Sequence, residues 1–382
     1  TIVANAPTAT RQTLVSTPDR HLLFFGTETT IGTTSTQDDM YIRWSDQESI
    51  DASTSYAPSA TNTAGTQRLA DGTRIIAAIR GRDAIYVWTD NALFIMRFVG
   101  APFVFSFQQV GTGCGLIGKN AAVEVDGSAY WMSENGFFRY TGKLESMACL
   151  VEDYVFDDIN TVPRSHIFAG LNNLFGEVTW FYPGSGAASN NRSVTYNYMD
   201  STPERPVWTT STLARSAWSD SHIFGKPHGT EYDSSATSDS TVGNTDGVTT
   251  YYEHETGNNE MKAGAGSAIA ASIESGDFDI SRTQGGGADI RGDGEYMMKI
   301  RRVLPDFLQQ TGDARVTLNL KNYPTDSQAS SSLGPFSSTT STTKIDTRAR
   351  ARAISLKVDN TSTGQHWKLG TFRLDIQPDG RR

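Results

Sequence analysis

The sequence predicts an all-β fold: a β-propeller-like body followed by an antiparallel β-sheet or sandwich at the C-terminal end. Three observations support this prediction. A β-hairpin pattern recurs at a fixed interval, Gly, Ser and Thr are abundant, and no stretch of about 12 residues keeps the 3.6-residue apolar period of a helix. A chain of 382 residues is also too long for one ordinary core unless the fold is modular.

The repeat lies in residues 82–140, which contain the same hairpin twice, 44 residues apart. The first copy places Tyr86, Thr89, Asp90, Asn91, Leu93 and Phe94 where the second has Tyr130, Ser133, Glu134, Asn135, Phe137 and Phe138. One interval earlier, Trp44, Ser45 and Asp46 match Trp88, Thr89 and Asp90, and EVTWFYPG at 177–184 is a weaker echo. A period of about 40–45 residues with several strands in each unit is typical of a β-propeller blade.

The blades are predicted in chain order. One covers residues 73–111, with Phe103, Phe105 and Phe107 on one face of its last strand. The next runs from about residue 120 to 156 and closes on YVFDDIN, and another begins at HIFAGLNN. A fifth is formed by SHIFGKPHGTEYD and GVTTYYEHE, which the low-complexity loop SSATSDSTVGNTDG separates. We expect the repeated aromatic residues to form the core between blades: Trp44, Tyr86, Trp88, Phe94, Tyr130, Trp131 and Phe138.

The body is predicted to span residues 1–284, with about five blades that residues outside this chain could complete. A Gly-rich hinge, TQGGGADIRGDGE, leads into residues 285–382, where longer strands alternate apolar and polar residues. The formal charge of −9 disfavours a protein that coats nucleic acid. Residues 299–382 nevertheless carry 14 Lys and Arg against 7 Asp and Glu, a net charge of +7, which leaves −16 for residues 1–298.

The segment RARARA is a candidate subunit interface. Alternation in a strand would place Arg348, Arg350 and Arg352 on one face, in line with Ile354 and its apolar successors. Guanidinium groups in register suit pairing with carboxylates or phosphates. A solvated edge strand, protected from aggregation by its charge, is an equally good explanation.

Two motifs for phosphate binding overlap in GTGCGLIGKN, residues 111–120, which contains both G-x-G-x-x-G and G-x-x-x-x-G-K. Both motifs need a helix immediately afterwards, because the free amides at its N-terminus hold the anion. The sequence that follows, AAVEVDGSAYW, alternates with the period of a strand, and Asn120 stands where magnesium binding needs Ser or Thr. We therefore interpret the segment as a turn between blades and predict no cofactor.

No catalytic or metal site is predicted. The six His residues are scattered, and HGTEYD and EHE are better explained as turns than as metal ligands. Asp46, Asp90 and Glu134 occupy equivalent repeat positions, which favours turn chemistry over a single catalytic pair. Two Cys residues are too few for a disulfide framework and suit a reducing place of synthesis. No run of 18 apolar residues is present, so we expect no membrane insertion, and the absence of an initiator Met suggests a processed or partial start.

The chain resembles the nozzle, or packaged-DNA-stabilisation, proteins of short-tailed bacteriophages. The resemblance rests on IRWSD, RLADGTRIIAAI, IYVWTDNALFIMRFVG, GCGLIGKNAAVEVDGSAYWMSENGFFRYTGK, YVFDDIN and the ending WKLGTFRLDIQPDGRR, and it is strongest between residues 40 and 160. It implies a structural protein of the virion tail, made in the bacterial cytoplasm. It further implies a homo-oligomeric ring, commonly a hexamer, that forms the distal end of the DNA exit channel and retains and then releases the packaged DNA.

The resemblance also implies partners. These are the portal and adaptor proteins, the tail fibre or tail needle proteins, and double-stranded DNA that passes through the lumen without sequence-specific binding. We expect the acidic body to line the lumen, since like charge lets DNA slide, and the basic C-terminal part to dock on an acidic neighbour. The alternative is a propeller that binds host glycans or degrades polysaccharide. It predicts Trp, Asp and Glu clustered in a cleft, whereas the seven Trp are dispersed along the chain.

Overall fold

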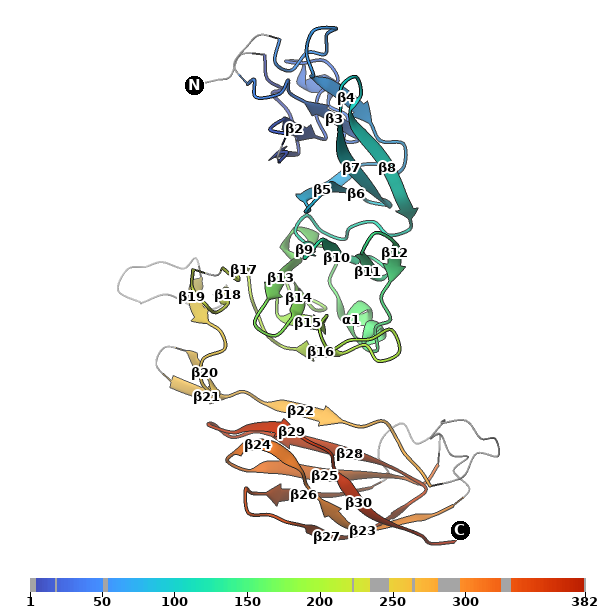
Figure 1. The fold of residues 1–382 in the computed structure, drawn as a ribbon. Coiled ribbons are helices and arrows are strands. Elements are labelled where there is room, and N and C mark those ends of the chain that lie inside the picture. The colour runs from blue at the N-terminus through green and yellow to red at the C-terminus, as the bar shows by residue number, and fades with distance from the viewer. Residues whose placement is uncertain are drawn as a thin grey trace. The chain divides into compact units, whose positions relative to one another are not determined.

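The computed structural model describes residues 5–17, 19–50, 54–221, 223–233, 247–262, 265–280, 296–323 and 331–380. It is almost entirely β, with 51% of residues in strands and 4% in helices, and its sheets are antiparallel (Figure 1). This confirms the predicted fold class. The chain forms two compact units, unit 1 at Thr1–Glu255 and unit 2 at Thr256–Arg382.

Unit 1 consists of consecutive meanders, in which each strand pairs with the next one along the chain. The first sheet contains β1 (Gln12–Val15), β2 (Leu22–Phe25), β3 (Tyr41–Trp44) and β4 (Gly65–Arg68). The second contains β5 (Ile75–Arg80), β6 (Ile85–Thr89), β7 (Ala92–Gly100) and β8 (Val104–Thr112). The third sheet contains β9 (Ala122–Val125), β10 (Ser128–Ser133), β11 (Gly136–Tyr140) and β12 (Leu144–Ser146). The fourth contains β13 (Phe168–Asn172), β14 (Glu177–Tyr182), β15 (Arg192–Asn197) and β16 (Trp208–Ser211). A three-stranded fifth sheet contains β17 (Ala217–Ser219), β18 (His228–Asp233) and β19 (Val248–Glu253).

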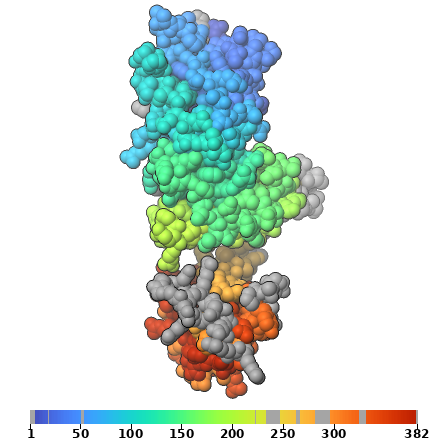
Figure 2. Space-filling view, turned by 90° about the vertical axis from the view of Figure 1, so that its right-hand side faces the viewer, coloured from blue at the N-terminus to red at the C-terminus, as the bar shows by residue number. Residues whose placement is uncertain are grey.

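The five sheets of unit 1 are arranged in series. The first strand of each sheet lies beside the first strand of the next, from β1 through β5, β9 and β13 to β17. The Gln12 side chain joins the first two of these strands, since it donates to the Ala78 carbonyl and accepts from the Ala78 amide at 2.7 and 2.8 Å. Figure 1 shows the series as open, with sheet β1–β4 and sheet β17–β19 at its two ends. In Figure 2 the atoms of the first four sheets, coloured blue to green, form an unbroken body.

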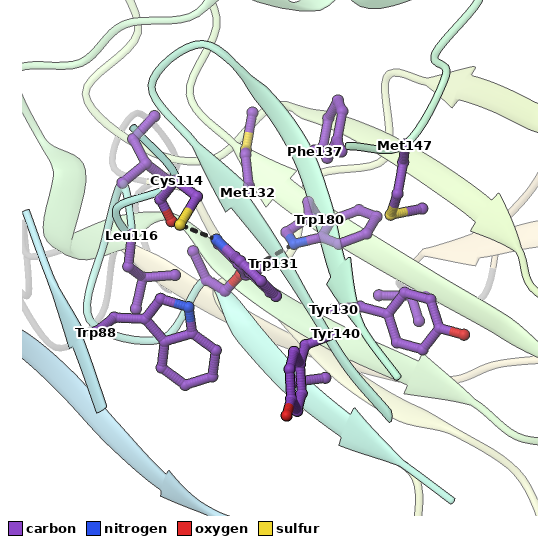
Figure 3. Packing of buried hydrophobic residues seen from close by; sticks show 14 of the residues in the cluster. Trp88, Cys114, Leu116, Tyr130, Trp131, Met132, Phe137, Tyr140, Met147 and Trp180 are labelled. Carbon is purple, nitrogen blue, oxygen red and sulfur yellow. Dashed lines mark hydrogen bonds between the residues drawn. The ribbon is translucent and has the colours of Figure 1, made fainter. Parts of the chain in front are cut away.

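Apolar cores fill the spaces between sheets rather than the inside of any one sheet. One cluster joins the first two sheets around Phe25, Ile42 and Phe94, and a larger one joins the second, third and fourth. Figure 3 shows the larger cluster, in which Trp88 and Trp131 meet edge to face with ring centroids 5.4 Å apart. The second strands of the second, third and fourth sheets, β6, β10 and β14, bury residues on both faces, so they read as near-continuous apolar runs.

Three tryptophan side chains bind neighbouring segments, Trp131 and Trp180 from the second strand of the third and fourth sheets and Trp218 from the first strand of the fifth. Trp131 Nε1 donates to the Cys114 carbonyl at 2.8 Å, and Trp180 Nε1 donates to the Ala121 carbonyl at 3.0 Å (Figure 3). Trp218 Nε1 donates to the Leu171 carbonyl at 2.7 Å. Each indole thus fills the space between two sheets and satisfies a backbone acceptor on the preceding part of the chain.

The twin hairpins have the predicted geometry. Trp88 pairs with Leu93 across the turn Asp90–Asn91, and Ser133 pairs with Gly136 across Glu134–Asn135. Of the seven residues predicted to form the repeat core, six are buried and Phe138 is partly buried. Trp44 is not structurally equivalent to Trp88, however. It lies in the third strand of its sheet, whereas Trp88, Trp131 and Trp180 lie in the second strand of theirs.

Two local predictions in unit 1 are wrong. The segment YVFDDIN does not close a blade as a strand, because Glu152–Asp158 forms helix α1. The acidic first turn of this helix explains the difference, since carboxylates there interact favourably with the free amides of a helix N-terminus. Phe103 does not share a buried face with Phe105: it lies outside β8 and is 77% exposed. Two short 3-10 helices, η1 (Thr34–Thr36) and η2 (Arg164–His166), complete the helical segments of the described residues.

Unit 2 is a β-sandwich with an added hairpin. One sheet has the order β22 (Ala271–Glu274), β28 (Ala353–Asn360), β25 (Ala314–Lys321), β26 (Ser331–Ser338). The other has the order β27 (Ile345–Ala351), β23 (Met298–Leu304), β30 (Arg373–Pro378). Two further pairs are β20 (Asn259–Lys262) with β21 (Ala265–Ala268), and β24 (Phe307–Thr311) with β29 (His366–Leu369). The core of unit 2 contains Ile300, Val316 and Ile354 among its fully buried residues.

The division between units falls earlier than the predicted boundary at residue 284. Strand β22 pairs with β28 along its whole length, so residues 271–274 belong to the sandwich and not to the body. The sequence gives little sign of this, because every residue of β22 is exposed and its pattern is weak. The predicted hinge TQGGGADIRGDGE and most of the low-complexity loop lie outside the described residues.

Candidate functional site: a polar cavity beside the fifth sheet

The structure separates the three arginines of the predicted interface. The segment RARARAISLKV is not one strand: β27 pairs with β23 in one sheet, and β28 pairs with β25 in the other. Arg348 and Arg350 are exposed on the outer face of β27, while Arg352, half-buried, lies where the chain crosses to β28. The prediction that these arginines lie in line with Ile354 is therefore wrong, because the crossing brings Ile354 into the core of the sandwich.

The outer face of sheet β27–β23–β30 is charged. Arg350 stands opposite Lys299 and forms an ion pair with Asp379. The hydrogen bond from Arg350 outweighs the effect of desolvation and holds the pKa of Asp379 below its ordinary value. Arg348 makes no ion pair within the described ranges, so its exposed guanidinium remains available to a carboxylate or phosphate of another molecule.

The acidic repeat residues do not mainly bind the amides of their own turns, contrary to the prediction: Asp46 and Asp90 each bind a threonine 17 positions away along the chain. Asp46 accepts from the Thr63 amide at 2.8 Å and from the Thr63 hydroxyl at 2.6 Å. Asp90 accepts in the same way from the Thr73 amide, at 2.8 Å, and from the Thr73 hydroxyl. Partial desolvation alone would raise the pKa of both carboxyls, but these hydrogen bonds outweigh it and lower the pKa. Glu134 differs, since it forms an ion pair with Arg164.

The segment GTGCGLIGKN connects the second and third sheets. Strand β9 follows it, so the helix that both phosphate motifs need is replaced by a strand, as predicted. Its glycines permit close packing: a Cβ at Gly115 would lie 2.1 Å from the Asp90 carbonyl oxygen, and one at Gly118 would lie 2.4 Å from that of Arg164. The residues that the structure describes contain no group of three or more His, Cys, Asp or Glu side chains placed to hold a metal ion.

A cavity of about 610 Å³ lies between the fourth and fifth sheets of unit 1. Its polar wall comes from the connection before β13, the loop before β15 and the start of β17: Ser165, His166, Ser189, Asn190 and Ser216. Phe168, Trp218 and Tyr232 form its aromatic wall. Lining residues come from segments more than a hundred positions apart, so the sequence alone offered no signal for this site.

Asn190 is the buried polar side chain of the cavity, 8% exposed. Its Nδ2 donates to the His166 carbonyl at 2.7 Å and to the Arg215 carbonyl at 3.1 Å. These two bonds orient the side-chain amide. Its Oδ1 is buried and accepts no hydrogen bond from any residue that the structure describes. A buried acceptor without a donor costs about 1–3 kcal/mol, so a donor that reached this oxygen would recover part of that cost.

A charged network lies behind Trp218. The Arg215 side chain, 4% exposed, donates through Nε to His254 Nε2 at 3.0 Å. Its guanidinium carbon lies 4.0 Å from the centroid of the Tyr252 ring, whose hydroxyl donates to Glu231 at 2.8 Å. Trp218 in turn packs on the His254 ring at a centroid distance of 4.4 Å. The network therefore fixes one aromatic wall of the cavity.

His254 is held in its neutral form. Burial of the ring, with the positive charge of Arg215 as the next cause, lowers the pKa of His254 to about 4. The hydrogen bond from Arg215 requires an unprotonated Nε2, so the neutral ring carries its proton on Nδ1. A shifted pKa beside a cavity is a recognised mark of functional sites, although the imidazole itself does not line this cavity.

Comparisons with known proteins do not name a family for this chain. No protein-family model matches it, and no curated protein matches it. The described part of the chain includes no helix with the length and apolar character needed to span a bilayer.

Proposed function

We propose that this chain is a structural subunit of a ring-shaped bacteriophage tail nozzle, which forms the distal DNA exit channel and retains and then releases the packaged DNA. The main support is the serial arrangement of sheets, in which aromatic cores join each sheet to its neighbours. Cores of this kind resist shear between sheets, because packed side chains interdigitate and leave few voids. A stiff wall built in this way suits a channel that must withstand the pressure of packaged DNA.

The proposal also specifies how copies of the chain assemble. The four full sheets are β-propeller-like blades, the open series is completed in the ring, and the ring is a hexamer. Unit 1, where 16 Lys and Arg stand against 28 Asp and Glu for a net charge of −12 over residues 1–255, contributes the lumen. DNA slides past such a wall because like charges disfavour contact with the phosphate backbone. The charged outer face of sheet β27–β23–β30 docks on an acidic neighbour of the tail, with Arg348 as a free contact.

Imaging of the purified chain by electron microscopy tests this function. We expect rings of one defined symmetry whose bore carries acidic side chains. A chain that stays monomeric at all concentrations contradicts the proposal, and so does a ring in which Arg348 and Arg350 line the bore. R348E should weaken docking to the adjoining tail protein and leave the fold unchanged. T343E, also exposed and close to β27, is a matched control for the added charge.

A further inference from the structure

We propose that the cavity between the fourth and fifth sheets is a binding site for a neutral saccharide. This inference stands apart from the nozzle proposal, because ring assembly does not require the cavity. Its volume of about 610 Å³ falls in the range of sites that hold small organic ligands, about 300–1,000 Å³. A monosaccharide or one end of an oligosaccharide fits such a space.

The chemistry of the wall selects a ligand without charge. Among the described residues that line the cavity, none is a carboxylate, a Lys or an Arg. The guanidinium of the buried Arg215 contacts His254, Glu231 and Tyr252. Asn190 in the cavity wall contacts the Arg215 backbone carbonyl, which accepts a hydrogen bond from Asn190 Nδ2. The one imidazole among the described lining residues, His166, is exposed and donates from Nδ1 to the Ala188 carbonyl at 2.8 Å, so a phosphate or carboxylate ligand would find no buried cation in the wall.

The polar groups of the wall suit hydroxyl groups. Asn190 Oδ1 needs a donor and is held in place by the two bonds of its Nδ2. Ser165 and Ser189 stand on the same wall and can each donate or accept. A sugar ring presents several hydroxyls at fixed spacing, so one of them can donate to Asn190 while its neighbours bind the serines. Sites that bind ligand hydroxyls in this way discriminate strongly against analogues that lack them.

The aromatic groups suit the other side of a sugar ring. Trp218 is held by its bond to Leu171 and by packing on His254, and Tyr232 is 41% exposed on β18. The face of an aromatic ring is electronegative and attracts the weakly positive C–H groups of a pyranose. A cavity lined by both hydroxyl and aromatic side chains therefore suits the hydroxyl groups and the C–H groups of a saccharide.

A glycan array that carries neutral and anionic bacterial surface oligosaccharides provides the test. The full chain should bind neutral members and should not bind the anionic ones more strongly. A217F places a ring at the mouth of the cavity, since Ala217 is an exposed lining residue of β17, and should abolish binding. S189L adds bulk at another lining position and serves as the second variant if A217F does not fold. A60F, which changes an exposed alanine in a loop of the first sheet, should bind like the original chain.

The outcomes are distinct. The proposal is overturned if no neutral glycan binds, if anionic glycans bind best, or if folded A217F and S189L retain binding. Ring formation by A217F should match that of the original chain, so a loss of glycan binding with intact rings supports the saccharide site by itself. Binding by the original chain without any ring formation would support the site and contradict the nozzle proposal.

Discussion

Acid should loosen the fifth sheet through His254. The pKa of this ring is about 4 in the folded chain against an ordinary value of 6.5, so the unfolded chain binds more protons between these two pH values. The contribution of neutral His254 to the stability of the folded chain is therefore complete above about pH 6.5 and is lost as the pH falls toward about 4. Protonation places a hydrogen on Nε2, which breaks the 3.0 Å bond from Arg215 and brings two cations together.

The expected magnitude follows from the two pKa values. A shift from 6.5 to about 4 corresponds to at most about 3 kcal/mol. Because the ring is only partly buried, solvent screens the charge, and we expect a loss of about 1–2 kcal/mol in local stability between about pH 7 and about pH 4. Most of this loss should fall on β17–β19, which the network holds together.

Hydrogen exchange of the β18 and β19 amides, corrected for the intrinsic effect of pH, measures the local opening free energy. H254Q is the matched variant, because its side-chain oxygen still accepts from Arg215 but does not titrate. The difference between the two proteins isolates His254 from the carboxylates. Parallel pH profiles for the original chain and H254Q would refute this reasoning.

Three further predictions concern packing and reactivity. W131A should lower the free energy of unfolding in urea by about 3–5 kcal/mol, because the side chain is fully buried between two sheets; a loss below about 1 kcal/mol would contradict the inter-sheet core. In thermal unfolding, G115A should lose about 1–3 kcal/mol, since its Cβ would meet the Asp90 carbonyl at 2.1 Å, while G276A, with open space around it, should change little. Burial raises the pKa of the Cys149 thiol to about 11. Alkylation of Cys149 at about pH 8 should therefore be roughly 100-fold slower in the native chain than in urea. Equal alkylation rates would contradict the burial of this thiol.

Several features could be predicted from the sequence because they depend on neighbours along the chain. Period-two apolar alternation and the polar pairs Asp90–Asn91 and Glu134–Asn135 specify hairpins locally, and the structure has both. The strand-like residues after GTGCGLIGKN likewise ruled out the helix of a phosphate site. The predicted sandwich in unit 2 follows from alternation alone, since its strands bury one face each.

Other features depend on contacts between distant segments. Alternation assigns Arg348 and Ile354 the same face of one strand, but hydrogen bonding to different partners, β23 and β25, divides that strand between two sheets. The Asn190 cavity is lined by residues between positions 120 and 232, and the neutral state of His254 results first from burial of its ring and then from the charge of Arg215, 39 positions away. The sequence thus determined the hairpins and their repetition through local backbone preference and side-chain period. Only the tertiary structure decided which sheet each strand joins and where polar groups become buried. Burial and the choice of strand partner arise from packing between segments that are distant in the sequence.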